Sequence, residues 1–300
     1  DACERLNIPY SLSVRTRRLS LTTKSGKKVY CYKASTPLNF QASVTLSKDK
    51  FELHQALEPS GLPLPDQERI KNSDELRNFF SRHQKIVVKP ADSHGGRGVT
   101  VLPSQKELES AWERARKESR IVIAEQYVAG KNYRFLVLND KVLAIAFRQP
   151  PTIKGDGITN LETLFTDLNA ENKAQGLPKI PDTPYTWKIV KDQGYSRDSI
   201  PPAGSEILLR LTANLSLGGT VQDVTDLCHP SYKQLAIEAT KQLGLTFAGI
   251  DIIAEDISTP NKPAFIIEAN AAPGLRIHYK STNGKTADVA MQVISAIMEL

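Results

Sequence analysis

Two short apolar runs near the end of the chain constrain the fold more than any other feature. They begin at Phe247 and Ala264, both are rich in β-branched residues, and a turn-like segment around Thr259–Pro260 lies between them. This pattern predicts a β-hairpin. If the hairpin is symmetric about Thr259–Pro260, Asp251 lies directly opposite Glu268, with Cβ atoms about 5 Å apart.

Three oxygen-bearing side chains of this hairpin indicate a metal site. Glu268 and Asn270 are two residues apart on one strand, so they project from the same face. Carboxylates at the separation expected for Asp251 and Glu268 repel by about 3 kcal/mol at an effective dielectric of about 20, and a cation reverses that cost. Carboxylate and amide oxygens suit Mg²⁺. From spacing alone, this metal site and a solvated hairpin with unrelated acids are equally consistent with the sequence.

A glycine-rich loop follows another predicted strand, Lys85–Pro90. Lys89 lies near the end of that strand, and the loop residues His94, Gly95, Gly96 and Gly98 follow it. Glycines let backbone N–H groups approach a phosphate, because no Cβ intervenes and positive φ is accessible. The spacing matches neither the Walker A pattern nor GxGxxG. By itself, the loop fits an ordinary turn better than a phosphate site.

Composition is that of an ordinary globular protein. The 300 residues are 40% hydrophobic with a mean hydropathy of −0.33. No apolar run approaches the ~20 residues that span a bilayer, so we expect two or three subdomains and no membrane partner. Cys3, Cys31 and Cys228 are far apart and form no CxxC pair, which predicts a reducing cytoplasm and no zinc site. No signal peptide is recognised, and the start at Asp1 allows upstream processing or truncation.

The net charge of +6 and the pI near 9.1 admit a nucleic acid, a membrane surface or an anionic small ligand as partner. The densest basic run, Arg15–Arg18, is short and contains no interleaved aromatic residue. Elsewhere, as in Glu113–Glu118, basic residues alternate with acids. No RNP, KH or zinc-finger pattern is present. We therefore expect a solvated basic surface and no nucleic-acid partner, with an RNA-binding protein as the alternative interpretation.

The remaining patterns predict mixed helices and strands. Before residue 46 we expect a helix and short β segments such as Lys28–Tyr32. Further along we expect helices at Phe51–Leu57, Ser73–Phe80, Gln105–Lys117 and Ala287–Leu300, a strand at Ile121–Glu125 and a hairpin turn at Asn139–Asp140. Residues 149–206 contain seven of the 18 prolines, which predicts a less regular insertion with one helix, Asn160–Asn172.

Six ordered blocks together resemble the ATP-grasp ligases over nearly the whole chain. They are Ser35–Leu38, Ser47–Lys50, Glu125–Arg134, Gly155–Gly157, Arg210–Asp226 and Glu268–His278. The pattern is most similar to the ATP-grasp module of cyanophycin synthetase. It is somewhat less similar to the glutathione synthetase module of bifunctional glutathione enzymes. No Mur-ligase-like module like that of cyanophycin synthetase is recognised in this sequence, so single and iterative ligation are both left open.

The resemblance implies an α+β ATP-grasp fold, in which two α+β subdomains grip ATP. An N-terminal segment, residues 1–46, precedes one subdomain, residues 47–125, which carries the glycine-rich loop. The second subdomain covers residues 126–300 and contains the insertion 149–206.

The resemblance also implies which residues bind ATP. Lys50 and Lys89 would neutralise its phosphates, and the loop residues His94, Gly95, Gly96 and Gly98 would cover them. The backbone of Gln126 and Val128 would meet the adenine edge, with Glu125 accepting its amino hydrogen. Asn132 stands where the family usually carries an acid for the ribose hydroxyls, which removes a charge but keeps an acceptor.

Further roles concern the metal and the reacting groups. Asp251, Glu268 and Asn270 would hold Mg²⁺, with Mn²⁺ as the alternative. Arg210 and Asn214 would meet the γ-phosphate and the acylphosphate oxygens. Candidates for substrate carboxylates are Arg134, Arg148, Arg276 and His278, together with His94 and Arg97 on the loop; surface ion pairs are the competing interpretation for all six.

The implied activity is that of an ATP-dependent carboxylate-amine ligase. It would make a peptide or isopeptide bond through an acylphosphate and release ADP and phosphate. The expected partners are a small molecule or peptide with a free carboxylate and an amine-bearing amino acid, and a homo-oligomer is left open. A non-catalytic ATP-binding homologue and a glutathione-synthetase-like ligase are the alternatives.

Overall fold

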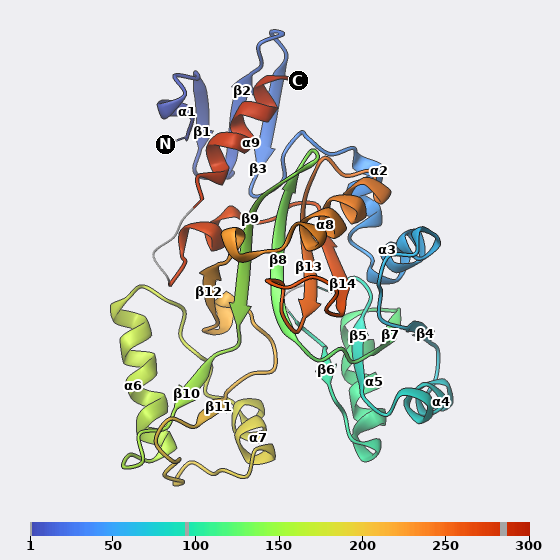
Figure 1. Ribbon diagram of the computed structural model, residues 1–300, viewed down its shortest axis with the longest axis vertical. Helices are drawn as coiled ribbons and strands as arrows, with labels where there is room; N and C mark the ends of the chain where they lie inside the picture. Colours follow the sequence, from blue (N-terminus) through green and yellow to red (C-terminus); the bar gives the residue numbers. More distant parts are fainter. Residues whose placement is uncertain (1, 94–95, 283–286) are drawn as a thin grey trace. The chain divides into compact units, whose positions relative to one another are not determined.

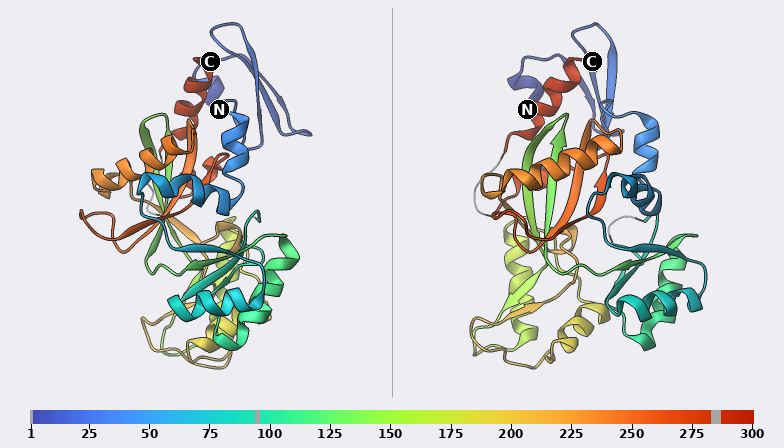
Figure 2. Two further views of the ribbon diagram at one scale, coloured as in Figure 1. Left: turned by 90° about the vertical axis from the view of Figure 1, so that its right-hand side faces the viewer. Right: turned by 45° about the vertical axis from the view of Figure 1, so that its right-hand side comes forward.

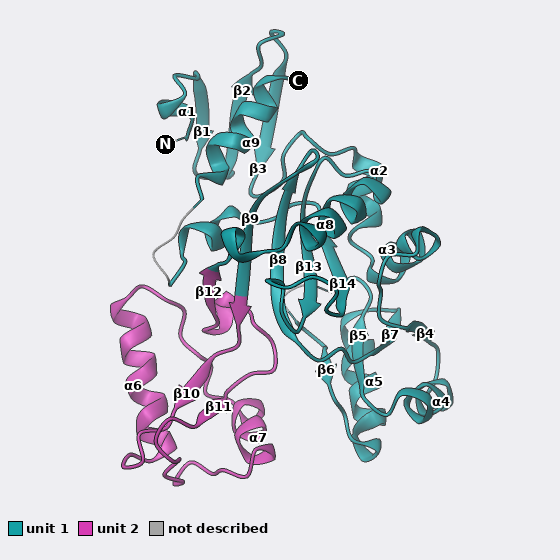
Figure 3. Cartoon of the chain, in the orientation of Figure 1, with its two compact units in different colours: residues 1–147, 223–300 teal, residues 148–222 magenta. Residues whose placement is uncertain are grey.

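The computed structural model describes residues 2–93, 96–282 and 287–300 (Figure 1). The chain divides into two compact units, which Figure 3 distinguishes by colour. Unit 1 contains residues 1–147 and 223–300, and unit 2 contains residues 148–222. The architecture is α+β, with antiparallel strand pairs in its sheets. Among the described residues, no helix is long and apolar enough to cross a membrane.

The largest sheet of unit 1 contains the predicted hairpin. Its strands are β8 (Lys131–Leu138), β9 (Lys141–Gln149), β13 (Phe247–Ala254) and β14 (Ala264–Asn270), in the order β9-β8-β13-β14. The predicted turn between β8 and β9 is confirmed, and Asn139 has a φ of 52°, the left-handed conformation that asparagine tolerates. Helix α8 (Pro230–Gln242) covers one face of this sheet (Figure 2).

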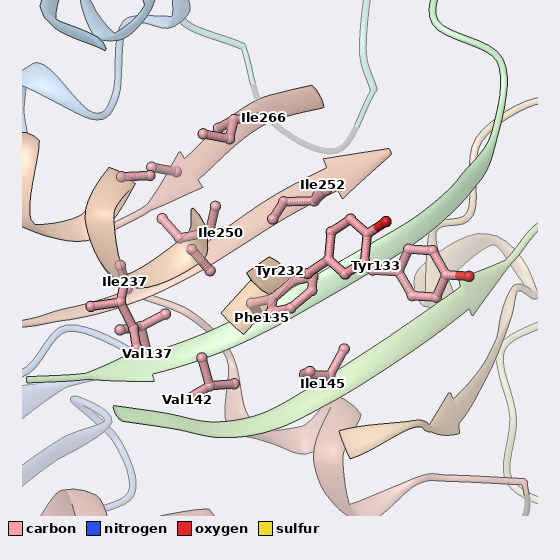
Figure 4. Close-up of a cluster of buried hydrophobic side chains, with 14 of the residues drawn as sticks. Tyr133, Phe135, Val137, Val142, Ile145, Tyr232, Ile237, Ile250, Ile252 and Ile266 are labelled. Atoms are coloured by element: carbon pink, nitrogen blue, oxygen red, sulfur yellow. The ribbon is translucent and has the colours of Figure 1, made fainter. Parts of the chain in front are cut away.

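The core of unit 1 lies between that sheet and α8. Alternate residues of β8 and β13 point into it, as the two-residue period of a strand requires. Buried residues labelled in Figure 4 include Tyr133, Phe135, Val137, Ile250, Ile252 and Ile266 from the strands and Tyr232 and Ile237 from α8. β-branched and aromatic side chains suit this half-buried sheet surface.

A β-bulge separates the core from the polar face of the hairpin. Asp251 is paired with Glu268 as predicted, but Ile252 is paired with Ile266, so Ile267 has no opposite residue. The hairpin is therefore not symmetric throughout. An extra residue shifts the alternation of a strand. Ile266 consequently stays in the core, whereas Glu268 and Asn270 project from the opposite face and remain partly exposed.

A second sheet of unit 1 has the order β4 (Gln67–Ile70), β7 (Val122–Gln126), β5 (Ile86–Pro90), β6 (Thr100–Val101). Helices α4 (Ser73–His83) and α5 (Leu108–Glu118) contribute to the core against one of its faces. The side chain of Asn72 caps α4, and a capping box at Ser104 and Glu107 starts the short 3₁₀ turn before α5. The face of this sheet opposite that core carries Lys89 and Glu125.

The N-terminal segment of unit 1 forms a third sheet. Its elements are α1 (Ala2–Arg5), β1 (Tyr10–Ser13), β2 (Arg18–Thr22) and β3 (Lys28–Tyr32), with the strands in sequence order. The C-terminal helix α9 (Val289–Met298) packs with it in one apolar cluster (Figure 1). Helices α2 (Gln41–Leu46) and α3 (Lys50–Leu57) follow. Asn39 joins this segment to the large sheet through hydrogen bonds to the backbone of residues 246, 247 and 271.

Unit 2 has its own apolar cluster and a two-stranded sheet. Its elements are β10 (Thr152–Lys154), α6 (Leu161–Ala174), α7 (Pro184–Asp192), β11 (Glu206–Leu208), the 3₁₀ turn Leu215–Leu217 and most of β12 (Thr220–Asp223). The expected single helix corresponds to α6. The expectation missed α7, although Thr183 caps it and Pro184 occupies its first turn, a position where proline is favoured.

Candidate functional site

Lys89 and Glu125 form a buried ion pair on the face of the second sheet that points away from α4 and α5. The Lys89 Nζ atom lies 2.5 Å from Glu125 Oε2, and both side chains are only 6% exposed. Gln67 Nε2 donates a second hydrogen bond, of 2.8 Å, to the same oxygen. The register explains this arrangement, because Gln67 and Val87 both lie opposite Glu125. The two predicted ATP-binding residues are thus brought together.

Lys50 joins this pair to the hairpin carboxylates. The Asp49 side chain caps α3, and Lys50 N–H donates to Ala91 O, which ties the start of the helix to the end of β5. Lys50 Nζ donates to Ser93 O (2.7 Å) and lies 3.8 Å from Glu268 Oε1. Burial lowers the pKa of Lys50, the charge of Glu268 opposes this, and that of Lys89 lowers it further. Lys50 and Lys89 therefore lie within one polar site.

Arg134 and Asp251 form a second buried ion pair. Their strand positions are opposite in the β8–β13 register, and Arg134 Nε and Nη2 lie 2.6 and 2.7 Å from the two Asp251 oxygens. Burial acts to lower the pKa of Arg134, but the charge of Asp251, these hydrogen bonds and Glu268 together raise it. At Gly249, a Cβ would lie 3.3 Å from Arg134 Cδ, so glycine leaves room for this side chain.

The three predicted metal ligands are oxygen donors on the same end of the hairpin. Glu268 is partly exposed, and Asn270 Oδ1 accepts a hydrogen bond from Ala272 N–H. Both Asp251 oxygens are bonded to Arg134. Each carboxylate therefore has a cationic side chain near it, Arg134 for Asp251 and Lys50 for Glu268. These cations offset the repulsion between the two carboxylates from which the metal site was predicted. Among the described residues no group of three His, Cys, Asp or Glu could hold a metal; the predicted set has only two carboxylates and an amide.

The glycine-rich loop is described in part. The predicted residues His94 and Gly95 lie outside the described residues. Gly96 and Gly98 have φ of 77° and 71°, values that favour glycine. At Gly98 a Cβ would come within 2.8 Å of Pro90 Cγ, so this glycine also serves packing. Arg97 is exposed and lies 3.8 Å from Glu118, which fits the surface ion pair; its role in substrate binding stays a prediction.

The segment predicted to meet adenine follows β7. The Gln126 N–H donates to Asp66 O, so this donor already has a partner within the protein. Val128 lies just beyond the strand. Gly130 has a φ of 151°, and a Cβ there would come within 2.9 Å of the Ala254 backbone. This explains why glycine occurs where β8 begins. Asn132 lies opposite Ile253 and is partly buried; its ribose role stays a prediction.

Arg210, Asn214 and Arg148 belong to unit 2. Arg210 is 8% exposed, its guanidinium lies 5.2 Å from the Tyr185 ring centroid, and Nη2 is 3.3 Å from Thr183 Oγ1. Its Nε atom has no partner among the described residues. Burial lowers the pKa of Arg210. The Asn214 carbonyl accepts from Leu217 and Gly219 N–H. A buried guanidinium with a free donor suits an anionic ligand.

His278 and Arg276 lie on the 3₁₀ turn Leu275–Tyr279 of unit 1. His278 is 2% exposed, and within the described ranges neither ring nitrogen has a hydrogen-bond partner. Burial lowers the pKa of His278 to about 4, against the charge of Asp223 and together with that of Arg134. The ring is therefore neutral at pH 7 and carries one donor and one acceptor. Arg276 is exposed, and its predicted role in substrate binding stays a prediction.

Sequence reasoning did not identify Gln67 or Asp223. Gln67 contacts Glu125 because a short four-residue strand pairs with β7, and four residues give too weak a periodic signal to fix a register. The charge of Asp223 acts to raise the pKa of His278, which is 55 residues away in sequence. Neither relationship is visible without the fold.

Comparisons with known proteins agree with this architecture. The family model for the ATP-grasp domain matches residues 47–154, and that for the RimK-like ATP-grasp domain matches residues 210–297. The fold is the α+β ATP-grasp fold, and the chain belongs to the ATP-grasp family, whose members use ATP and Mg²⁺. It is homologous to the ATP-grasp part of cyanophycin synthetase and to the glutathione synthetase module of bifunctional glutathione proteins.

Particular relatives support this assignment. Cyanophycin synthetase of Trichormus variabilis is 38% identical over 85% of this chain and 29% of its own length. The glutathione biosynthesis bifunctional protein of Clostridium perfringens is 30% identical over 98% of this chain and 40% of its own length. The crystal structure of a bifunctional glutathione synthetase from Pasteurella multocida covers 99% of this chain, with 27% identity and a TM-score of 0.69. The chain thus spans less than half the length of these relatives.

Proposed function

We propose that the protein is an ATP-dependent ligase that joins a carboxylate to an amine. The observation that carries the proposal is the convergence of Lys50, Lys89, Glu268 and the Arg134–Asp251 pair on one polar site. Buried cations beside partly exposed oxygen donors suit a polyphosphate and its metal. The homology to two kinds of amide-forming enzyme points to the same chemistry.

In the proposed reaction, a substrate carboxylate oxygen attacks the γ-phosphorus and the bond to the β-phosphate oxygen breaks. The amine nitrogen then attacks the acyl carbon and inorganic phosphate leaves, so ADP, phosphate and an amide are the products. Lys50 and Lys89 would orient and neutralise the phosphates, because a fixed charge costs no reorganisation during the reaction. Arg210, with its unused Nε, would meet the transferred phosphoryl group.

The donor set fits a divalent cation. Glu268 and Asn270 are partly exposed oxygen donors, and Asp251, held by Arg134, lies opposite Glu268. These three residues would hold Mg²⁺, or Mn²⁺ in its place. When bound, the ion supplies charge neutralisation for the phosphates. The residues themselves keep their positions through Arg134 and the bulge at Ile267.

The substrates belong to the same proposal. A small molecule or peptide with a free carboxylate and an amine-bearing amino acid fit the unpaired polar groups of His278 and the exposed guanidinium of Arg276. A glutathione-synthetase-like ligase would use the same site with a dipeptide carboxylate. A non-catalytic ATP-binding protein would bind ATP without releasing ADP.

An ADP-release assay with a panel of amino acids and short peptides tests the proposal. We expect ADP only when a suitable carboxylate is added, with products identified by mass spectrometry. Lys89→Met should reduce ADP release about 100-fold or more because it removes a phosphate-facing charge. Lys85→Met, which changes an exposed lysine next to the same strand, is the matched control. ATP binding without substrate-dependent ADP across the panel would support the non-catalytic alternative and contradict the ligase.

A further inference from the structure

The N-terminal segment carries the net charge of the whole protein. Residues 1–33 contain eight Lys and Arg and two Asp and Glu, a net charge of +6, which equals that of all 300 residues. Residues 34–300 contain 31 residues of each sign. The excess positive charge is therefore confined to α1, the β1–β3 sheet and their loops. A local concentration of one sign attracts polyanions.

The two faces of this sheet differ in exposure. On β3, Val29 and Cys31 are buried in the cluster shared with α9, whereas Tyr30 and Tyr32, which alternate with them, are 46% and 52% exposed. Alternate residues of a strand project to the same face. Both tyrosines therefore lie on the outer face, about 7 Å apart along the strand.

A basic side chain lies over each ring. The Arg18 guanidinium lies 5.1 Å from the Tyr30 ring centroid, and Lys33 Nζ lies 5.1 Å from that of Tyr32. Arg18 is also opposite Tyr32 in the β2–β3 register. Further exposed basic residues of the same segment are Arg15, Arg17 and Lys28. Each exposed ring thus has a cation over it and others nearby.

The fold places aromatic side chains next to the basic run Arg15–Arg18. The run Arg15–Arg18 contains no interleaved aromatic residue along the chain, but antiparallel pairing of β2 with β3 brings Tyr30 and Tyr32 next to it. Single-stranded nucleic-acid sites combine aromatic platforms for the bases with cations for the phosphates. An acidic peptide would use the cations but would leave the rings without a matching partner.

We propose that the outer face of the β1–β3 sheet binds a single-stranded nucleic acid. Tyr30 and Tyr32 stack with two bases, and the cations around them contact the phosphates: Arg15, Arg17, Arg18, Lys28 and Lys33. The spacing of the rings, about 7 Å, exceeds the ~3.4 Å between stacked bases of one strand, so the site fits an unstacked strand. This site is separate from the proposed ligase activity and does not depend on it.

Fluorescence anisotropy of a labelled oligonucleotide of about twelve thymidines or uridines, with the whole chain, tests the proposal. We expect saturable binding whose logarithmic association constant falls with the logarithm of salt concentration by about 0.7 per phosphate contact, or about 3.5 for five contacts. Tyr30→Leu with Tyr32→Leu should weaken binding about tenfold for each ring. Tyr30→Phe with Tyr32→Phe should retain it, because phenylalanine keeps the stacking surface.

A second pair of variants tests the cations without touching the rings. Arg15→Ala with Arg17→Ala should weaken binding and lower the salt slope by about 1.4. Lys106→Ala with Lys117→Ala removes the same charge from the electrically balanced part of the chain and should leave both unchanged. Absence of saturable binding at about 50 mM salt, or equal affinities of the Leu and Phe variants, would contradict the proposal. Tighter binding of polyglutamate than of the oligonucleotide would contradict it too and would assign the surface to an acidic peptide.

Discussion

Arg134 and Asp251 face each other across β8 and β13 and are joined by two hydrogen bonds, of 2.6 and 2.7 Å. Bidentate contact fixes both the position and the plane of the carboxylate. Because Asp251 also lies opposite Glu268, this one ion pair orients the acidic end of the hairpin.

Arg134→Met should destabilise the protein by about 3–5 kcal/mol, because it leaves the Asp251 carboxylate buried without its partner. The free energy of unfolding from urea titration measures this effect. Arg134→Met combined with Asp251→Leu removes both charges and should recover part of the loss. An unchanged urea midpoint for the single variant would show that the pair does not hold the site.

Glu268→Gln should reduce ATP turnover about 100-fold and raise the Mg²⁺ concentration needed for half-maximal activity, since it removes a charged oxygen donor without changing core volume. Steady-state ADP release over a Mg²⁺ series measures both. Glu255→Gln, an exposed acid of the same hairpin, is the control and should behave as the wild type. Wild-type Mg²⁺ dependence of Glu268→Gln would exclude this residue as a ligand.

Two substitutions in the glycine-rich loop should have different effects. Gly96→Val should raise the KM for ATP, because a β-branched residue at a φ of 77° obstructs backbone approach to the phosphates. Gly98→Ala should mainly lower thermal stability, because its Cβ would lie 2.8 Å from Pro90 Cγ and 2.9 Å from Glu118 Cγ. Kinetics and thermal melting of both variants separate the two effects. An unchanged KM for Gly96→Val would identify the loop as an ordinary turn.

His278 should make stability depend on pH. Its folded pKa of about 4 lies below its ordinary value of 6.5, so the unfolded state binds an additional proton between these values. The contribution of the neutral His278 ring to stability is therefore fully present above pH 6.5 and is lost as the pH falls towards 4. Relative to His278→Phe, the wild type should lose about 2–3 kcal/mol of unfolding free energy between pH 7.5 and pH 4.5. A constant difference between the two proteins over this range would contradict the buried neutral ring.

Local sequence patterns predicted much of the fold, and the hairpin shows which features they could not predict. The predicted pairing of Asp251 opposite Glu268 is confirmed, because turn position and hydrophobic alternation fix a local register. The bulge at Ile267 was not foreseen, since alternation across one inserted residue looks the same in sequence as a strand end. Pairing of Arg134 with Asp251 depends on contact between strands 117 residues apart, and no local signal reports such a contact.

The binding residues illustrate the same limit. The resemblance to ATP-grasp ligases placed Lys50, Lys89 and Glu125 in one site, and the structure brings them together. It did not predict that Glu125 would bind Lys89 directly. The aromatic partners of Arg15–Arg18 were missed for a related reason, because they come from β3 rather than from the run itself.

In the proposed reaction, a carboxylate becomes an acylphosphate before the amine attacks. The most direct measurement uses the carboxylate substrate identified by the ADP-release panel, labelled with ¹⁸O in its carboxyl group, with mass spectrometry of the phosphate released. The proposed reaction transfers one carboxylate oxygen to phosphorus, so the phosphate should carry one ¹⁸O atom, and Arg210→Ala should suppress its formation. Unlabelled phosphate, formed at the same rate as ADP, would show that water attacks the γ-phosphorus and would contradict the ligase mechanism.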